Sequence, residues 1–279
     1  MHAAPHHALT VDVEEWFHVC GVNALSAPYW PSLPSRVVDN TRWLLDLFER
    51  TGTHATFFVL GYVAERYPRL VERIIRDGHE VGSHGHMHDR VYDLAPETFA
   101  ADVDRSLAAL AACGATRIRG FRAPEWSIND RSMWALEVLA RRGFTFDSSM
   151  APLRIIGNTA FPRSRHRRTT IAGDLIECPP AVARRFGQQI PFGGGWGLRM
   201  SQPERFLRDL DVRAEAGDSA VIWVHPWEID DAPPHAPMPR AQRFAHYFRL
   251  SGFRSRFERI VSGGAFGPLG PLALEPAAA

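Results

Sequence analysis

Leu9–Trp16, with the sequence LTVDVEEW, reads as a strand that runs directly into acidic residues. Successive side chains of a strand point to opposite faces, so the apolar residues share one face while Asp12 and Glu14 share the other. Glu15 points away from this pair unless the chain has already turned. Because two buried like charges are costly without a cation or a shared proton, the strand end predicts a metal site or a catalytic carboxylate. A solvated strand end is the alternative.

Further strand patterns follow along the chain, and segments with helical spacing of apolar residues separate them. Strands are predicted over 8–13, 54–60, 79–83, 117–122, 143–147, 171–178 and 219–225. Helices are predicted over 35–50, 62–77, 96–112, 130–142, 203–216 and 240–262. Repeated strand–helix units imply right-handed crossovers and a parallel sheet. We therefore expect an α/β fold, a (β/α) barrel of about seven parallel strands that is distorted or incomplete.

A histidine-rich segment, Gly82–Asp89 (GSHGHMHD), follows the third predicted strand. Imidazole is a common ligand of zinc and related divalent ions. His84 and His88 would meet on one face of a helical turn, whereas His86 shares that face only if the segment is extended. The segment therefore predicts a metal site, and a solvated histidine-rich loop is the alternative.

Ionisable residues also end three other predicted strands, at Arg122, Asp147 and His225. In a parallel barrel the active site forms at the carboxyl ends of the strands. Side chains from five strand ends would therefore gather at one face of the barrel. Together they predict a shared active site more strongly than any single motif does.

The chain of 279 residues is long enough for one large domain. We expect a single domain over 1–262 that includes a helical extension over about 231–262, followed by a poorly ordered Gly-, Pro- and Ala-rich tail over 263–279. A net charge of +1 and 45% hydrophobic residues give no sign of disorder or of nucleic-acid binding.

The sequence contains no run of about 18 apolar residues, so we expect no integral membrane segment. Residues 1–7 lack the basic and apolar regions of a signal peptide, which predicts a cytoplasmic location. Cys20, Cys113 and Cys178 are far apart in the sequence, which favours reduced thiols. All 32 basic residues are arginine. The absence of lysine excludes Schiff-base chemistry and a lysine general base.

Five segments in order resemble the motifs of the polysaccharide deacetylases, the NodB-homology proteins of carbohydrate esterase family 4. These segments are Thr10–Glu14, Ser83–His88, Phe121–Ser127, Phe146–Ser149 and Val224–Glu228. The resemblance covers roughly residues 8–230. The opening VDVEEWFH, the later HPWEI and the stretch from Arg243 to Tyr247 further resemble the branch found in exosortase-associated exopolysaccharide loci.

The resemblance implies a divalent metal, with Zn²⁺ as the first expectation, bound by one carboxylate and two histidines. The family's first motif has two adjacent aspartates, a general base and a metal ligand, and here Val13 stands in the second position. Strand parity then makes Glu14 the ligand and leaves Asp12 as the base, with Glu15 as the alternative ligand.

The family's two histidine ligands match His84 and His88. His86 is expected to contact a ligand or the substrate rather than to be a fourth ligand. His225 would be the general acid that protonates the leaving amine, and Arg122 would orient the base. Asp147 would orient His225 or, alternatively, cap a loop.

The implied activity is removal of N-acetyl groups from an amino-sugar polysaccharide or its precursor, in exopolysaccharide production. A peripheral association with an exopolysaccharide assembly system is a further expectation. Two other functions stay open at this point. One is hydrolysis of another linear amide, such as a formamide or a ureide, and the other is a non-catalytic carbohydrate-binding barrel.

Substrate contacts are expected from Trp126, Trp196, Trp227 and Gly194. The tryptophans offer flat apolar faces to a sugar ring, and the glycine-rich loop around Gly194 could approach a ligand closely. Packing in the core is the alternative for each tryptophan. The segment 163–168 is predicted to be a basic loop that either steers an anionic polymer or a lipid-linked phosphate or is simply solvated.

Overall fold

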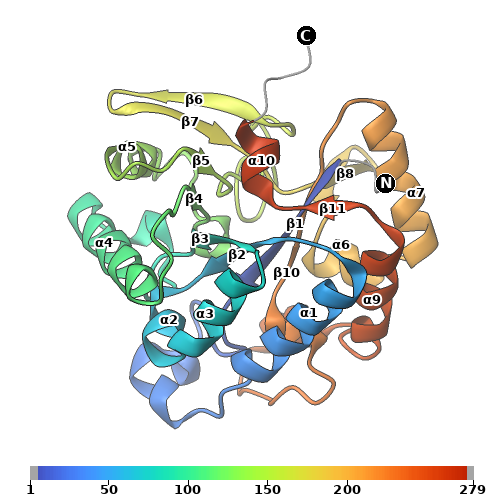
Figure 1. Cartoon of the computed structure of the whole chain (residues 1–279), viewed down its shortest axis with the longest axis horizontal. Helices are drawn as coiled ribbons and strands as arrows, with labels where there is room; N and C mark the ends of the chain where they lie inside the picture. Colours follow the sequence, from blue (N-terminus) through green and yellow to red (C-terminus); the bar gives the residue numbers. More distant parts are fainter. Residues whose placement is uncertain (1–5, 275–279) are drawn as a thin grey trace.

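The computed structural model describes residues 6–274, and one large sheet organises them (Figure 1). Its strands are β1 (His7–Val13), β2 (Thr56–Val59), β3 (Glu80–Ser83), β4 (Gly120–Phe121), β5 (Phe146–Asp147), β6 (His166–Thr170), β7 (Gly173–Glu177), β10 (Val221–Val224) and β11 (Phe266–Gly267). The strand order is β10-β1-β2-β3-β4-β5-β7-β6, and β11 pairs with β1. The strands from β10 to β7 are all parallel, and only β6 runs antiparallel. The expected α/β fold with about seven parallel strands is confirmed.

The sheet curls into a barrel that the chain after β7 completes. In this segment the Cys178 amide donates to the carbonyl of Asp147 at 2.8 Å, and the Ala181 amide donates to the carbonyl of Val221 at 3.1 Å. Irregular chain therefore bridges the gap between β5 and β10. The hairpin of β8 (Val182–Arg185) and β9 (Gln188–Pro191) projects beside it as a separate two-stranded sheet. The barrel is thus incomplete in its strand ladder, as expected.

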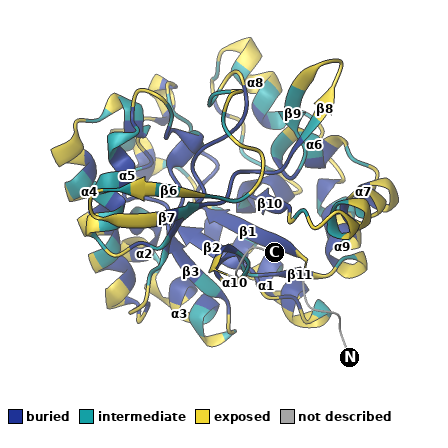
Figure 2. Cartoon of the chain, turned by 90° about the horizontal axis from the view of Figure 1, so that it is seen from above, coloured by how far each residue is buried: buried dark blue, intermediate teal, exposed yellow. Residues whose placement is uncertain are grey.

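Helices pack around the outside of the sheet (Figure 1). They are α1 (Val37–Thr51), α2 (Gly61–Arg66), α3 (Pro68–Arg76), α4 (Pro96–Ala112), α5 (Trp134–Arg141), α6 (Gly195–Met200), α7 (Pro203–Glu215), α8 (Arg240–Tyr247), α9 (Phe253–Gly263) and α10 (Leu269–Leu274). Figure 2 shows the central strands β1, β2 and β10 buried, whereas much of β6, β7 and the outer helix faces is exposed. None of the helices within residues 6–274 combines the length and apolar character that a bilayer-spanning segment needs.

The structure confirms the predicted alternation of apolar and polar side chains along β1. Leu9, Val11 and Val13 belong to the core that includes Leu44 and Phe48 of α1. Burying each such side chain stabilises the fold by roughly 1.5–3 kcal/mol. The polar face of β1 points into the barrel, where the Thr10 hydroxyl donates to the carbonyl of Ile222 at 2.8 Å. Acidic groups at the end of this strand are thereby held inside the barrel.

Two predicted helices are each divided in the structure. The helix expected over 62–77 breaks into α2 and α3 because Pro68 has no amide hydrogen and restricts the backbone of Tyr67. The helix expected over 240–262 becomes α8 and α9. Gly252, directly before α9, has φ 69°, a left-handed conformation that glycine adopts without steric cost.

The predictions for two further segments were wrong. Part of the expected basic loop 163–168 is strand β6, which pairs with β7. The expected disordered tail instead forms β11 and α10 over most of 263–274, and 275–279 lie outside the described residues. Leu269 and Ala273 of α10 pack with Ala8 and Phe146 and close the barrel at the start of its strands. A short apolar helix thus plugs the end opposite the predicted active site.

Candidate metal centre and catalytic site

Three predicted metal ligands converge at the carboxyl ends of β1 and β3. One ligand atom each from Glu14, His84 and His88 lies within 4.8 Å of the other two, and all three residues are buried. Nε2 of His88 is 2.6 Å from Oε2 of Glu14, and Nε2 of His84 is 3.5 Å from the same oxygen. One carboxylate and two imidazoles are donors that zinc accepts while keeping open positions.

The hydrogen bonding of these residues fits a bound cation. Nδ1 of His84 lies 2.7 Å from the carbonyl oxygen of Arg122. A carbonyl can only accept, so Nδ1 carries the hydrogen and Nε2 turns a lone pair toward Glu14. Although burial favours the neutral acid, His88 and His225 hold the pKa of Glu14 well below its usual range. An ionised oxygen of Glu14 therefore faces Nε2 of both histidines, and these three groups form a donor set that a divalent metal accepts.

The loop that carries the histidines is not a helical turn, so that part of the prediction was wrong. Gly85 has φ 76° and His88 has φ 57°. The carboxylate of Asp102, on α4, accepts hydrogen bonds from the amides of His86 at 2.7 Å and Met87 at 3.0 Å. A left-handed conformation costs a residue such as His88 roughly 1–2 kcal/mol, which these bonds help to offset. Asp102 is a supporting residue that the sequence motif did not indicate.

His86 faces away from its two neighbours. Its ring is fully buried against Gly61, where an added Cβ would lie 2.3 Å from Nδ1. Its Nε2 lies 3.6 Å from Oε2 of Glu65. His86 therefore packs against α2, and the expectation that it contacts a ligand or the substrate was wrong.

Glu15 supports the start of α1 instead of the metal centre. Its carboxylate accepts hydrogen bonds from the Ser35 hydroxyl and from the amides of Arg36 and Val37, the last two at 2.9 and 3.2 Å. Amides at a helix start otherwise lack partners, so this carboxylate has a structural function. Of the two candidate ligands, only Glu14 lies beside the histidines.

Glu14→Ala should lose most bound metal, while Glu15→Ala should retain it. The second change removes a capping interaction and should lower the free energy of unfolding by about 1 kcal/mol. Elemental analysis and thermal unfolding of both variants measure the two effects. Metal loss in Glu15→Ala with metal retained in Glu14→Ala would contradict this arrangement.

Asp12 is positioned by a fully buried arginine. Nη1 of Arg122 donates to Oδ1 of Asp12 at 2.7 Å and also contacts the Thr10 hydroxyl at 2.7 Å. The guanidinium lies between the rings of Phe58 and Trp126, at 4.3 and 4.4 Å from their centroids. Both rings hold Arg122 through cation–π contacts. Trp126 is 6% exposed, so the prediction that it contacts a sugar is replaced by this packing function.

His225 follows β10 and approaches the two acidic residues of β1. Its Nε2 lies 3.8 Å from Oδ2 of Asp12 and 3.8 Å from Oε1 of Glu14. Its Nδ1 lies 2.9 Å from Oε2 of Glu228. Burial opposes a charged ring, but the carboxylates of Glu14, Glu228 and Asp12 raise the pKa of His225 to about 9.

Glu228 orients His225, so the prediction that Asp147 does so was wrong. Oε1 of Glu228 lies 3.2 Å from Nε of the buried Arg199, which fixes the carboxylate. Asp147 instead accepts a hydrogen bond from the Ser149 hydroxyl at 2.5 Å and pairs along the sheet with Glu177. Burial raises the pKa of Asp147 to about 6. The sequence signal for Glu228 was its position three residues after His225.

The other predicted substrate contacts have different surroundings. Trp227 donates from Nε1 to Oε1 of Glu14 at 3.0 Å and stacks on His225. It therefore positions the candidate metal ligand Glu14 instead of contacting a sugar. An added Cβ at Gly194 would lie 2.2 Å from the Trp223 ring, so Gly194 allows packing against β10. Trp196 remains 38% exposed and lines a groove that none of the three metal ligands lines.

Comparisons with known proteins agree with this geometry. Residues 30–146 match the polysaccharide deacetylase family, and residues 148–273 match a domain of unknown function (DUF3473). The chitooligosaccharide deacetylase of Bradyrhizobium sp. (strain ANU 289) is 32% identical over 174 residues, which cover 61% of this chain and 73% of that protein. The chain belongs to the polysaccharide deacetylase family.

Two further matches describe length and fold. A peptidoglycan deacetylase-like protein of Gibberella zeae is 29% identical over 60% of this chain, and the match spans only 49% of that protein. A Mycobacterium smegmatis structure provisionally described as a polysaccharide deacetylase has a TM-score of 0.60 at 19% identity, covering 100% of this chain and 98% of that one. This likeness shows that the fold is shared along the whole chain.

The site crosses the boundary between the two matched regions. His84, His88 and Arg122 lie in the deacetylase match, Asp12 and Glu14 precede it, and His225 lies in the second match. The second region therefore contributes a side chain to the same site, and the two regions form one barrel.

Proposed function

We propose that the chain is a metal-dependent hydrolase that removes N-acetyl groups from an amino-sugar polymer or its precursor. The observation that carries this proposal is the arrangement of Asp12 and His225 beside the cluster of Glu14, His84 and His88. The cluster supplies a site for a metal, and the other two residues supply a base and an acid. Zn²⁺ is the metal we propose, because the ligands are nitrogen and carboxylate oxygen.

A bound divalent ion would polarise the amide carbonyl and favour deprotonation of a nearby water. Asp12 is engaged with Arg122 through Oδ1, which leaves Oδ2 facing the centre to accept a proton from the attacking water. The water oxygen bonds to the acetyl carbon, and the carbon–nitrogen bond then breaks. His225 donates from Nε2 to the leaving nitrogen, because its Nδ1 is engaged with Glu228. The products are acetate and a free sugar amine.

The wider context stays a prediction from the sequence. It includes a part in exopolysaccharide production, a peripheral association with an assembly system and a cytoplasmic location. The family match supports an N-acetylated sugar as the substrate. The retained base and acid favour an enzyme over a non-catalytic carbohydrate-binding barrel.

Zinc-loaded protein should release acetate from N-acetylglucosamine oligomers but should not hydrolyse the C–N bonds of small formamides or ureides. Asp12→Asn should keep the metal and reduce the rate by a factor on the order of 10² to 10⁴, the range for loss of general base catalysis. Asp93→Asn, on an exposed turn, is the matched control and should behave like the wild type. Unchanged turnover in Asp12→Asn, or no acetate release from oligomers by metal-loaded protein, would overturn the proposal.

A further inference from the structure

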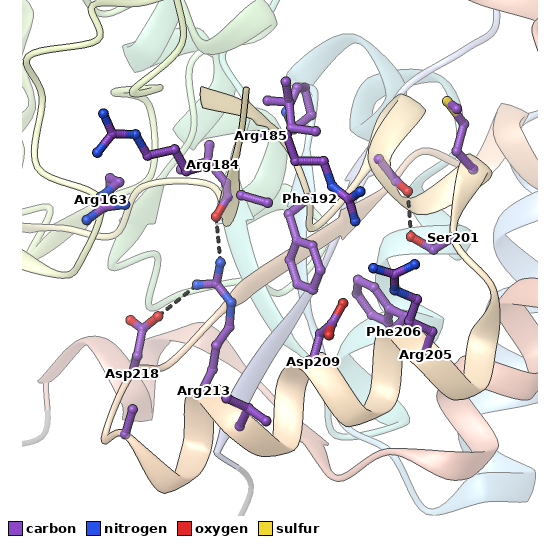
Figure 3. A pocket seen from close by; sticks show the side chains of 18 of the residues that line it. Arg163, Arg184, Arg185, Phe192, Ser201, Arg205, Phe206, Asp209, Arg213 and Asp218 are labelled. Atoms are coloured by element: carbon purple, nitrogen blue, oxygen red, sulfur yellow. Dashed lines mark hydrogen bonds and ion pairs between the residues drawn. The ribbon is translucent and has the colours of Figure 1, made fainter. Parts of the chain in front are cut away.

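A second concave site lies on the hairpin side of the barrel. Its volume is about 1300 Å³, and it is lined by the β8–β9 hairpin, α6, α7 and residues 162–164 (Figure 3). None of the three candidate metal ligands lines it. Three aromatic side chains do line it: the half-buried Phe192, the exposed Trp196 and the buried Phe206. We call this site the arginine groove.

The arginine groove carries a positive charge that its own acids do not neutralise. Five arginines and two aspartates line it. Arg213 is paired with Asp218 at 2.7 Å and stacks on Phe192, so its charge is already balanced. Four arginines remain: Arg163, Arg184, Arg185 and Arg205. Within residues 6–274, none of these four makes an ion pair with a carboxylate. The only other acidic residue in the lining is Asp209.

The free arginines are spread along the groove instead of converging on one point. Figure 3 shows Arg163 and Arg184 on one side of Phe192, and Arg185 and Arg205 on the other. A site for a single phosphate would have its guanidinium groups around one point. Arginines spread along a groove instead suit a polymer that carries a charge on successive units. A guanidinium matches a carboxylate through two parallel hydrogen bonds, and an exposed aromatic face suits a sugar ring.

Helix α6 connects this groove to the catalytic site. Trp196 and Met200 line the groove. Arg199, on the same helix, contacts Glu228, which holds His225. A strand bound in the groove would thus lie on the outer side of the helix that supports the general acid. The groove and the site both contact helix α6, although they are lined by different residues.

We propose that the arginine groove binds an anionic polysaccharide strand, one whose sugars carry carboxylates, and holds it next to the deacetylation site. The inference rests on the proposed function and specifies its substrate class. The substrate would combine N-acetylated sugars, which react, with acidic sugars, which bind in the groove. Neutral oligomers would then be processed without the benefit of this contact.

The test is direct binding of polygalacturonate to the zinc-loaded full chain, compared with a neutral N-acetylglucosamine hexamer and with inorganic pyrophosphate. Arg184→Ala/Arg185→Ala should weaken polygalacturonate binding by about tenfold or more, the loss expected for charge-assisted hydrogen bonds. Arg205→Ala, on α7, should weaken it independently of the hairpin. The matched control is Arg69→Ala/Arg117→Ala, which removes two exposed arginines outside the groove and should leave binding unchanged.

Deacetylation of a short neutral oligomer separates this proposal from the proposed function. It should be the same in the wild type and in the groove variants, since the arginines do not line the metal centre. The groove proposal would be overturned if polygalacturonate did not bind, or if the control variant weakened its binding as much as the groove variants do. The proposed function would still stand in that case, provided that the protein deacetylates the neutral oligomer. Binding of pyrophosphate but not polygalacturonate would also overturn the groove proposal, because the ligand would then be a phosphate.

Discussion

His84→Ala and His88→Ala should each lose most of the bound metal and all measurable turnover. Both side chains direct Nε2 at the same oxygen of Glu14, and each supplies one of the three ligands that cluster within residues 6–274. Loss of one imidazole leaves two ligands, too few for a stable zinc site. Elemental analysis of the purified variants, together with acetate release, measures both consequences.

His86→Ala is the matched control, because it removes an imidazole from the same loop. His86 packs against Gly61 and does not belong to the cluster of Glu14, His84 and His88, so this variant should keep stoichiometric metal. Removing its buried ring should lower stability by about 1–3 kcal/mol, which thermal unfolding would detect. Stoichiometric metal in His84→Ala or His88→Ala, or its loss in a folded His86→Ala, would refute the ligand set.

The second large effect is expected for His225→Ala. The variant should retain its fold and metal but lose a factor on the order of 10² to 10⁴ in the chemical rate, because the amine would leave without a general acid. The loss should be smaller for an N-acetylated weakly basic amine, since its nitrogen leaves with less protonation. Single-turnover rates of the wild type and the variant on both substrates measure the difference. An equal proportional loss on the two substrates would indicate that His225 serves structure or oxyanion binding.

Glu228→Gln tests the same assignment through pH. The neighbouring carboxylates raise the pKa of His225 to about 9, and Glu228 is one of them. A general acid must be protonated, so activity should fall as pH rises through this pKa. Removing the charge of Glu228 should lower the pKa and shift the alkaline limb of the rate profile to lower pH. An unshifted limb would show that another group controls it.

The sequence determined the fold class and most of the metal centre. Alternation in Leu9–Val13 is a local property of extended chain, so it correctly placed Asp12 and Glu14 inside the barrel. The succession of strands and helices similarly predicted a parallel barrel, because each crossover has few geometrical solutions. The strand ends of such a barrel must meet at one face, and the sequence therefore predicted that His84 and His225 lie close together.

The tertiary structure decided which partner holds each of these side chains. Glu228 rather than Asp147 contacts His225, and Trp227 bonds to Glu14 instead of facing a sugar. Asp102 of α4 accepts hydrogen bonds from two amides of the histidine loop and so stabilises its conformation. The contact of Glu228 with His225 is local and depends on side-chain rotamers. The contacts of Trp227 and Asp102 depend on how separate segments of the chain pack together. Sequence spacing alone determines neither the rotamers nor the packing.

The arginine groove shows the same division. Arginines in its lining come from segments that are separate in the sequence, and the strand pairing of β8 with β9 brings two of them opposite α7. The sequence showed 32 arginines against 31 acidic residues, a net charge of only +1. Only the folded chain, by pairing some arginines with nearby acids and leaving others free, decided where positive charge accumulates.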